Sequence, residues 1–173
     1  MTKIYRNGVI SSIQNMYMFL FTMGIYFVYI PWNLERLKLV ETDLGLWLFL
    51  FGIFNLLSNQ FNGRIIAPKF GTKNIIMVGT IILSACPFLL VSVNSYYMFM
   101  LIAFPFGIAF GLVSPNNQNQ VSYIESKTNK IYTPLYHACM SAGSLSGALA
   151  AAYVIKKDID PQITFAVMGI VIL

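Results

Sequence analysis

The sequence predicts an all-α integral membrane protein, a bundle of six transmembrane helices, from two observations. Hydrophobic residues make up 57% of its 173 residues and charged residues only 10%, whereas a soluble domain carries about 25% charged residues. Asp, Glu, Lys and Arg are also absent from four long segments, residues 7–34, 44–63, 74–124 and 131–155. A helix needs about 20 residues to span the hydrocarbon core, so the third segment has room for two spans. Because no water reaches the backbone in that layer, the spans are expected to be helical.

Apolar runs and the turn residues between them place the six helices along the chain. Asn94 and Ser95 divide the longest uncharged segment with a tight turn. Pro134 and Pro161 suit the first turn of a helix. The expected helices cover residues 13–32, 45–63, 75–93, 96–124, 134–155 and 161–173. The run from Pro161 to Leu173 is shorter than a full span, so we expect a truncated last helix, with a short or re-entrant segment as the alternative.

The charges of the loops predict which side of the membrane each loop faces. Six spans place the loops alternately on two sides, and cytoplasmic loops carry an excess of Lys and Arg. One side holds Lys3, Arg6, Arg64, Lys69, Lys73, Lys127 and Lys130 with the single acid Glu125. The other holds Arg36, Lys38, Lys156 and Lys157 with Glu35, Glu41, Asp43, Asp158 and Asp160. The first side, which includes the N-terminus, is therefore expected to be cytoplasmic.

The composition argues against several other classes of protein. Cys86 and Cys139 fall inside expected spans, where thiols act as small hydrophobic groups, so neither a disulfide nor a metal site is expected. His137 is the only histidine, and no acid lies in the middle of an expected span. The residues for hydrolysis or metal chemistry are largely missing, so we expect no enzyme and no cofactor. The net charge of +5 is spread over short loops rather than a basic face, which argues against nucleic acid.

The expected loop after the second helix resembles the signature loop of the major facilitator superfamily. Residues 62–73 read NGRIIAPKFGTK. In the family a glycine at the end of the second helix precedes a basic residue, an aromatic, a second glycine and another basic residue. The matching positions here are Gly63, Lys69, Phe70, Gly71 and Lys73. The spacing between the glycines is one residue longer than usual and Pro68 replaces the customary acid, so a charge-relay role is not expected.

The segment joining the fourth and fifth helices extends the resemblance. Its matching residues are Gln118, Asn119, Gln120, Glu125, Pro134, His137, Ser141, Gly143 and Gly147. Their order resembles the fucose-permease-like branch of bacterial inner-membrane facilitators. The resemblance covers nearly the whole chain and implies the N-terminal half of an inner-membrane permease, with the missing C-terminal half in the same polypeptide. The pair Gly147-Ala148 lacks the proline of the antiporter version, which argues against a drug/proton exchanger. A complete half-size membrane protein, acting as a homodimer or an accessory subunit, is the alternative.

Polar side chains inside the expected helices are the candidates for a path taken by a small polar solute. Such groups more often line a cavity or a helix interface than face lipid, and amides both donate and accept hydrogen bonds. The candidates are Asn15, Asn55, Asn59, Asn116, Asn117, Gln118, Gln120 and His137. The alternative role for each of them is hydrogen bonding between helices.

Residues of the cytoplasmic loops are the candidates for gating. They are Gly63, Lys69, Gly71, Lys73 and Glu125. Glu125 and His137 lie at the two ends of one turn, and histidine titrates near neutrality, so the pair could couple the solute to a proton. A structural pair that holds the two helices together is the alternative.

Two pairs of glycines at a spacing of four predict close helix contacts. Gly107 and Gly111 lie in the fourth expected helix, and Gly143 and Gly147 in the fifth. Small residues at this spacing let two backbones approach each other. Static packing is expected, with sliding between the helices during transport as the alternative.

Overall fold

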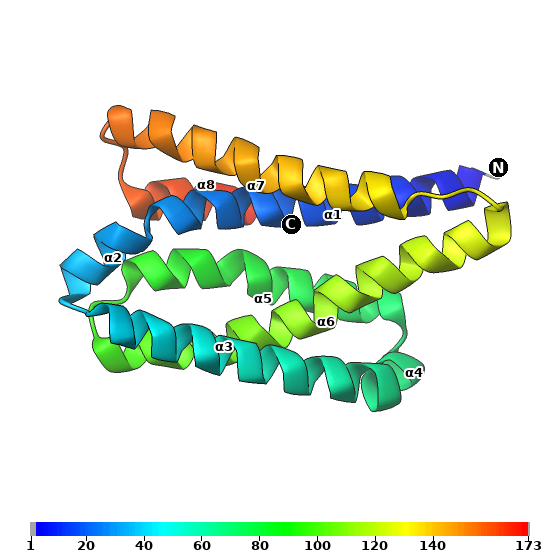
Figure 1. The fold of residues 1–173 in the computed structure, drawn as a ribbon, viewed down its shortest axis with the longest axis horizontal. Coiled ribbons are helices and arrows are strands. Elements are labelled where there is room, and N and C mark those ends of the chain that lie inside the picture. Colours follow the sequence, from blue (N-terminus) through cyan, green and yellow to red (C-terminus); the bar gives the residue numbers. More distant parts are fainter. Residues whose placement is uncertain (1–2, 173) are drawn as a thin grey trace.

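The structure is a computed structural model that describes residues 3–172, and it consists of helices joined by short turns. They are α1 (Lys3–Val28), α2 (Ile30–Leu37), α3 (Glu41–Phe61), the π-helical segment η1 (Asn62–Ile66), α4 (Ala67–Phe70), α5 (Thr72–Ser92), α6 (Tyr96–Thr128), α7 (Thr133–Lys156) and α8 (Pro161–Ile172). The long helices run alternately in opposite directions (Figure 1). The prediction of an all-α bundle is confirmed.

The bundle has two ends that carry different elements (Figure 1). The N-terminus, α4 and the α6–α7 turn lie at one end, called here the N-terminal end. Helix α2, the α5–α6 turn and the α7–α8 turn lie at the other, called here the α2 end. The two groups of charged residues that the alternation of loops predicts therefore lie at opposite ends of the molecule.

Most helices of the bundle are long and apolar enough to cross a bilayer. Four segments of the described chain meet this criterion: Glu41–Phe70, Thr72–Ser92, Tyr96–Thr128 and Thr133–Lys156. Helices α1 and α2 together form a fifth candidate span, with a bend of 48° between them. Helix α8 is apolar but has 12 residues, which corresponds to about 18 Å against a hydrocarbon core of about 30 Å. It is the short last helix that the sequence indicates; the predicted end at Leu173 lies outside the described residues.

Helix α1 begins earlier than the predicted start at Ile13 and is bent near its predicted end. It starts at Lys3, because the segment before Ile13 contains no proline and continues the helix. It stops at Val28, and Pro31 occupies the first turn of α2. A proline ring clashes with the preceding turn and provides no backbone N–H, so a helix that meets one bends or ends.

The helix that follows α2 does not end at Gly63, because most of the expected loop of residues 64–74 is helical. The chain passes from α3 through η1 into α4 and stays helical to Phe70. One wide π-helical turn accommodates Gly63, and Pro68 lies in the first turn of α4, where its missing N–H is tolerated. The reversal takes place at Gly71, whose φ of 79° is open to glycine and strained for other residues.

Close contacts at glycines join the helices in two pairs. A Cβ added to Gly147 of α7 would lie 2.0 Å from the carbonyl oxygen of Phe21 in α1. A Cβ added to Gly111 of α6 would lie 2.4 Å from the carbonyl oxygen of Asn55 in α3. The predicted glycine pairs therefore lie at the α1–α7 and α3–α6 interfaces, where the backbones touch.

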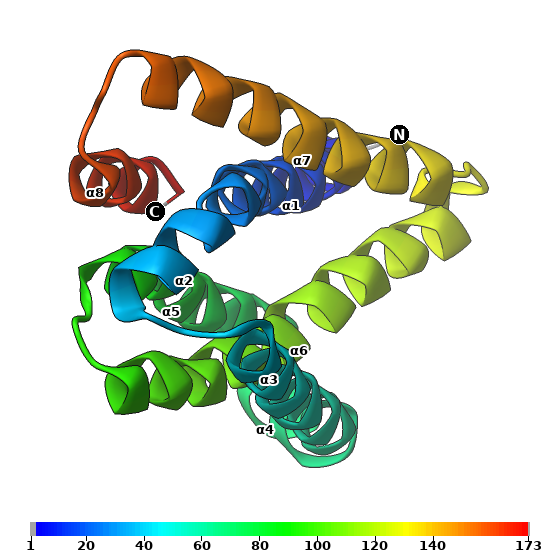
Figure 2. The ribbon, with the colours of Figure 1, turned by 60° about the vertical axis from the view of Figure 1, so that its left-hand side comes forward.

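Helix α6 extends from its partner α3 toward the α1–α7 pair, and one side of the bundle stays uncovered. Figure 2 shows α6 running from beside α3 toward the start of α7. Among the residues of α3 only Trp47 and Ser58 are buried. Helix α7 buries Tyr136 and a few small residues, Gly143, Gly147 and Ala151. Helices α3 and α7 therefore lie on either side of an uncovered face, and α6 is accessible between them.

The α2 end is held together by the side chain of Arg36. Its Nη1 donates to the carbonyl oxygen of Val93 at 2.7 Å and to Asn94 Oδ1 at 2.8 Å. The guanidinium also lies 4.7 Å from the ring centroid of Trp32. The last carbonyls of a helix have no donor within that helix, and a cation is favourable there. Arg36 therefore fixes α2 to the end of α5.

We expect Gly147→Ala to destabilise the protein, because the added methyl overlaps the backbone of α1. Overpacking of this kind costs about 1–3 kcal/mol, which should lower the midpoint of thermal unfolding in detergent. Gly52→Ala in α3 is the matched control, since a Cβ at Gly52 meets nothing within 4 Å. The control should be neutral or slightly stabilising because alanine favours the helix. Equal melting of the two variants would show that the α1–α7 contact is looser than described.

Candidate functional site

A pocket of about 440 Å³ lies on the uncovered face, between α3, α6 and α7, and is called here the polar pocket. Its lining residues are Asn55, Asn59, Phe110, Ser114, Pro115, Gln118, Tyr136, His137 and Met140. Asn55 and Asn59 are four residues apart, so one face of α3 presents both. The same spacing brings Ser114 and Gln118 to one face of α6. The pocket lies toward the N-terminal end, where α3 finishes and α7 begins.

Four of the predicted path residues meet in this pocket. Asn55 and Gln118 are partly buried, whereas Asn59 and His137 are exposed. Amide groups and a histidine ring on three helices can together donate hydrogen bonds to a solute and accept them from it. The site can therefore bind a polar molecule without a metal ion or a covalent bond.

Tyr136 belongs to the polar pocket, although the sequence analysis did not select it. Its side chain is 1% exposed, and its ring lies 5.3 Å from that of His137, centroid to centroid. The hydroxyl oxygen is buried and has no hydrogen-bond partner among the described residues. Its position next to the candidate His137 could have indicated it. An aromatic residue in an apolar helix is, however, usually taken to belong to the hydrophobic core.

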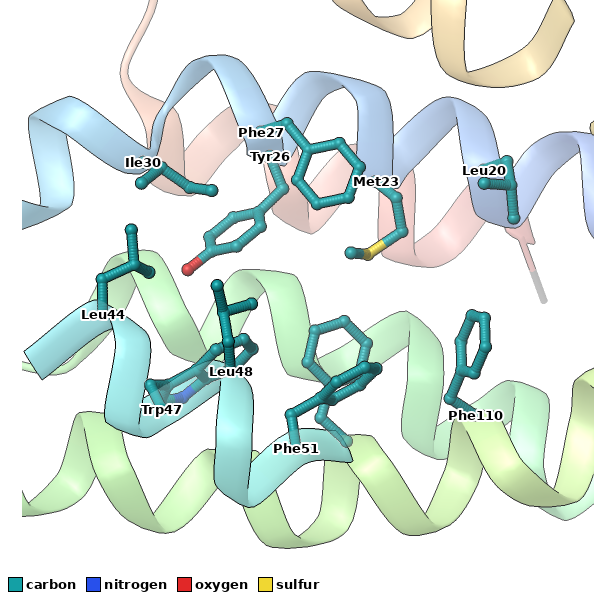
Figure 3. Close-up of a pocket in the computed structure, with 11 residues that line it drawn as sticks. Leu20, Met23, Tyr26, Phe27, Ile30, Leu44, Trp47, Leu48, Phe51 and Phe110 are labelled. Atoms are coloured by element: carbon teal, nitrogen blue, oxygen red, sulfur yellow. The ribbon is translucent and has the colours of Figure 1, made fainter. Parts of the chain in front are cut away.

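A second pocket, about 190 Å³ and called here the aromatic pocket, adjoins the first on the side of the α2 end. Helices α1, α2, α3 and α6 line it (Figure 3), with Leu20, Met23, Tyr26, Phe27, Ile30, Leu44, Trp47, Leu48, Phe51, Phe106 and Phe110. Trp47 and Phe51 stack with their planes 9° apart and their centroids 5.8 Å apart. Phe110 lines both pockets. The two pockets therefore share one wall residue, with polar groups in one of them and aromatic rings in the other.

The remaining predicted amides form hydrogen bonds between helices and line neither pocket. Asn117 Nδ2 donates to Asn15 Oδ1 at 2.9 Å, and Asn15 Nδ2 donates to Thr80 Oγ1 at 3.1 Å, which joins α1, α5 and α6. In the same way Asn116 Nδ2 donates to Asn62 Oδ1 at 3.0 Å. The Gln120 amide is 3.5 Å from the Gly8 carbonyl oxygen. These amides therefore hydrogen-bond between helices, which was the alternative role given for them. Their part in the solute path stays a prediction.

The predicted gating residues lie at the N-terminal end, outside both pockets. Gly63 lies in η1, Lys69 in α4, Gly71 at the reversal and Lys73 in the first turn of α5. The carboxylate of Glu125 accepts hydrogen bonds from the backbone N–H groups of Tyr132 and Thr133 and from Thr133 Oγ1. Negative charge is favourable at the start of a helix. Glu125 therefore joins the end of α6 to the start of α7.

A bundle of apolar helices with a polar pocket on an uncovered side is the arrangement of a membrane transporter, and comparison with known proteins identifies the family. Residues 13–173 match the Major Facilitator Superfamily. The chain belongs to this superfamily of secondary transporters and is a multi-pass membrane protein. The family consists of transporters rather than enzymes.

Two similar curated proteins come from bacteria. The quinolone resistance protein NorA of Staphylococcus aureus is 23% identical over 145 residues, which cover 84% of this chain and 35% of NorA. An uncharacterized MFS-type transporter of Yersinia pestis is 24% identical over 144 residues, which cover 83% of this chain and 37% of that protein. The matched region thus spans little more than a third of the length of either relative.

Replacing Asn117 by leucine should separate its interhelical role from a role in the solute path. The variant keeps the volume of the side chain but removes the donor to Asn15, so we expect a loss of about 1 kcal/mol and a lower midpoint of thermal unfolding. Asn119→Leu is the control, because Asn119 is exposed on the same helix. If Asn117→Leu melted like the control but abolished uptake by the whole transporter, the interhelical role would be refuted.

Proposed function

We propose that this chain is the N-terminal half of an inner-membrane permease that moves a small polar solute by alternating access. The observation that carries the proposal is the convergence of Asn55, Asn59, Gln118 and His137 in one pocket on the face flanked by α3 and α7. In transporters of this kind the solute site lies between two repeats, which rock around it. The C-terminal half of the same polypeptide would cover this face and supply the rest of the site.

The charges of the two ends support a cytoplasmic N-terminal end. That end carries Lys3, Arg6, Arg64, Lys69, Lys73, Lys127 and Lys130, and an excess of Lys and Arg in short loops favours the cytoplasm. In this orientation the polar pocket opens in the cytoplasmic half of the bilayer and the aromatic pocket in the outer half. A solute that enters from outside would then meet the aromatic walls first, and a solute that enters from the cytoplasm would meet the amide groups first.

The resemblance to the fucose-permease-like branch favours a neutral polyhydroxyl solute. It rests on the series from Gln118 to Gly147. Four members of this series lie in the polar pocket or at the α1–α7 contact, namely Gln118, His137, Gly143 and Gly147. The two relatives named above do not support that branch. The assignment to it is therefore a proposal that depends on this segment.

A solute with a flat apolar part is the second candidate. The aromatic pocket favours it, because aromatic faces pack against flat apolar groups, and one relative is by name a quinolone resistance protein. An amphipathic molecule could place its apolar part against Trp47 and Phe51 and its polar part against Asn55 and Gln118. The missing proline after Gly147 favours the first candidate.

Coupling to a proton, if present, would use His137 rather than Glu125. The carboxylate of Glu125 already accepts three hydrogen bonds at the start of α7. His137 is exposed in the polar pocket, where a proton and a solute could bind next to each other.

A transport screen tests the proposal and distinguishes the candidates. The whole polypeptide would be reconstituted in liposomes and tested with labelled sugars, polyols and fluorescent amphipathic drugs. We expect Gln118→Ala and His137→Ala to reduce uptake about tenfold or more, because each removes a contact to the solute. Asn119→Ala is the matched control, since that amide is exposed on the same helix and lines neither pocket, and it should transport like the wild type.

Two results would contradict the proposal. Wild-type uptake by both pocket variants would remove Gln118 and His137 from the path. Saturable transport by the 173-residue chain alone, in the absence of any second half, would favour the half-size homodimer instead.

A further inference from the structure

Four exposed cationic side chains from two distant parts of the sequence lie together at the N-terminal end of the bundle. They are called here the basic patch and are Lys3, Arg6, Lys127 and Lys130. The first two belong to the first turns of α1, and the other two to the end of α6 and the turn after it. A Cβ added to Gly8 of α1 would lie 2.9 Å from Ile124 Cδ1 of α6, so the two helices touch beside the patch. Figures 1 and 2 both show the start of α1 next to the α6–α7 turn.

The single acid at this end of the bundle is already engaged by the protein. The carboxylate of Glu125 accepts three hydrogen bonds from the start of α7. At the α2 end, by contrast, Lys156 and Lys157 are followed directly by Asp158 and, two residues on, by Asp160. The basic patch therefore keeps an excess of positive charge that the α2 end does not have.

The length of α6 places the basic patch at the depth of the lipid headgroups. Its 33 residues correspond to about 50 Å, whereas a bilayer with its headgroup layers is about 40–45 Å thick. No charged residue occurs in α6 before Glu125, so its uncharged part ends just before Lys127. The end of α6 therefore extends from the hydrocarbon core into the layer that contains the phosphate groups.

Exposed apolar side chains accompany the cations of the basic patch. Ile4 and Ile131, each adjacent in sequence to a lysine of the patch, are both largely exposed. The ring of Tyr123 is more than half exposed, and Lys127 Nζ lies 5.5 Å from its centroid. Cations next to exposed apolar groups suit the boundary between headgroups and hydrocarbon, where each kind of group finds its own solvent.

The basic patch lies away from the face that a second half would cover. Lys127 follows Gln118 by nine residues, which is two and a half turns of an α-helix. The two side chains therefore lie on opposite sides of α6, and Gln118 is the one that lines the polar pocket. Because Lys127 is also exposed, its side of α6 remains open to lipid when the second half is in place.

We propose that the basic patch binds the phosphate-bearing headgroup of an anionic phospholipid. A cluster of four or more Lys and Arg next to a transmembrane helix attracts anionic lipids, and each cation adds to the attraction. The exposed apolar side chains would contact the first carbons of the acyl chains. A lipid bound in this way joins the start of α1 to the end of α6. The inference concerns the lipid-facing side of the protein and does not depend on the solute.

The first part of the test compares two lipids that differ in headgroup charge. Thermal unfolding of the whole transporter in detergent would be followed as phosphatidylglycerol or phosphatidylcholine with the same acyl chains is added. A molecule that binds the folded protein raises the unfolding midpoint with its concentration, which gives an apparent affinity. We expect phosphatidylglycerol to act at a lower concentration than phosphatidylcholine, and added salt to reduce the difference. Glycerol phosphate in solution tests whether the phosphate alone is sufficient.

The second part removes charges at each end of the bundle. The double variant Lys127→Gln, Lys130→Gln should weaken the apparent affinity for phosphatidylglycerol about tenfold, because two attractive charges are lost. The double variant Lys156→Gln, Lys157→Gln is the matched control. It removes the same charge at the α2 end, where Lys157 also lies over a tyrosine ring, 5.9 Å from the centroid of Tyr153. The control should bind phosphatidylglycerol like the wild type.

Two further double variants separate charge from folding. Lys127→Arg with Lys130→Arg keeps both charges and should retain the wild-type affinity for phosphatidylglycerol. Lys3→Gln with Arg6→Gln removes the charges that α1 contributes and should weaken the affinity as the α6 variant does. This second pair keeps the test decisive if the first glutamine pair fails to fold.

Each outcome supports or overturns the proposal. A preference for phosphatidylglycerol that falls only in the glutamine variants of the basic patch would support it. Equal affinity of the wild type for the two lipids, or equal losses in the patch variant and the α2-end control, would overturn it. Protection by glycerol phosphate equal to that by phosphatidylglycerol would replace the lipid with a soluble anion, and so would also overturn it.

Discussion

A polar side chain in the hydrocarbon layer has no water to bind, and this constraint governs the arrangement of the bundle. The backbone meets it by forming helices, and the amide side chains meet it in two different ways. Asn15, Asn116 and Asn117 satisfy one another and their neighbours across helix interfaces. Asn55 and Gln118 instead face a pocket in which a solute can serve as the partner. The amides that hold helices together thus differ from those proposed to bind a solute in whether the fold itself supplies a hydrogen-bond partner.

Glycine determines where that pocket can form. Because backbones touch at Gly147 and at Gly111, α1 pairs with α7 and α3 pairs with α6. The long α6 extends from α3 toward the α1–α7 pair, and α3 and α7 keep most of their side chains uncovered. The polar and aromatic pockets both lie along α6 and share Phe110. A pocket on an uncovered side of the bundle is what the proposed transporter of two halves requires.

Much of the architecture could be predicted from residue types and their spacing. Charge-free segments predicted the apolar helices, Asn94 and Ser95 the α5–α6 turn, and the glycine pairs the close helix contacts. The helix ends near Gly63 and Pro31 were harder to predict, because glycine is tolerated within a helix and proline within its first turn. At Gly63 a π-helical turn carried the chain on to Gly71, where a positive φ finally required a glycine.

The sequence by itself determined that this chain is a bundle of membrane helices with its basic loops gathered at one end, because charge and hydropathy act locally along the chain. It also indicated which polar residues could matter. Only the tertiary structure decided which of them share a pocket, since that depends on how the helices rotate about their axes and which faces meet. The same packing buried the hydroxyl of Tyr136 without a partner, which no local pattern could reveal.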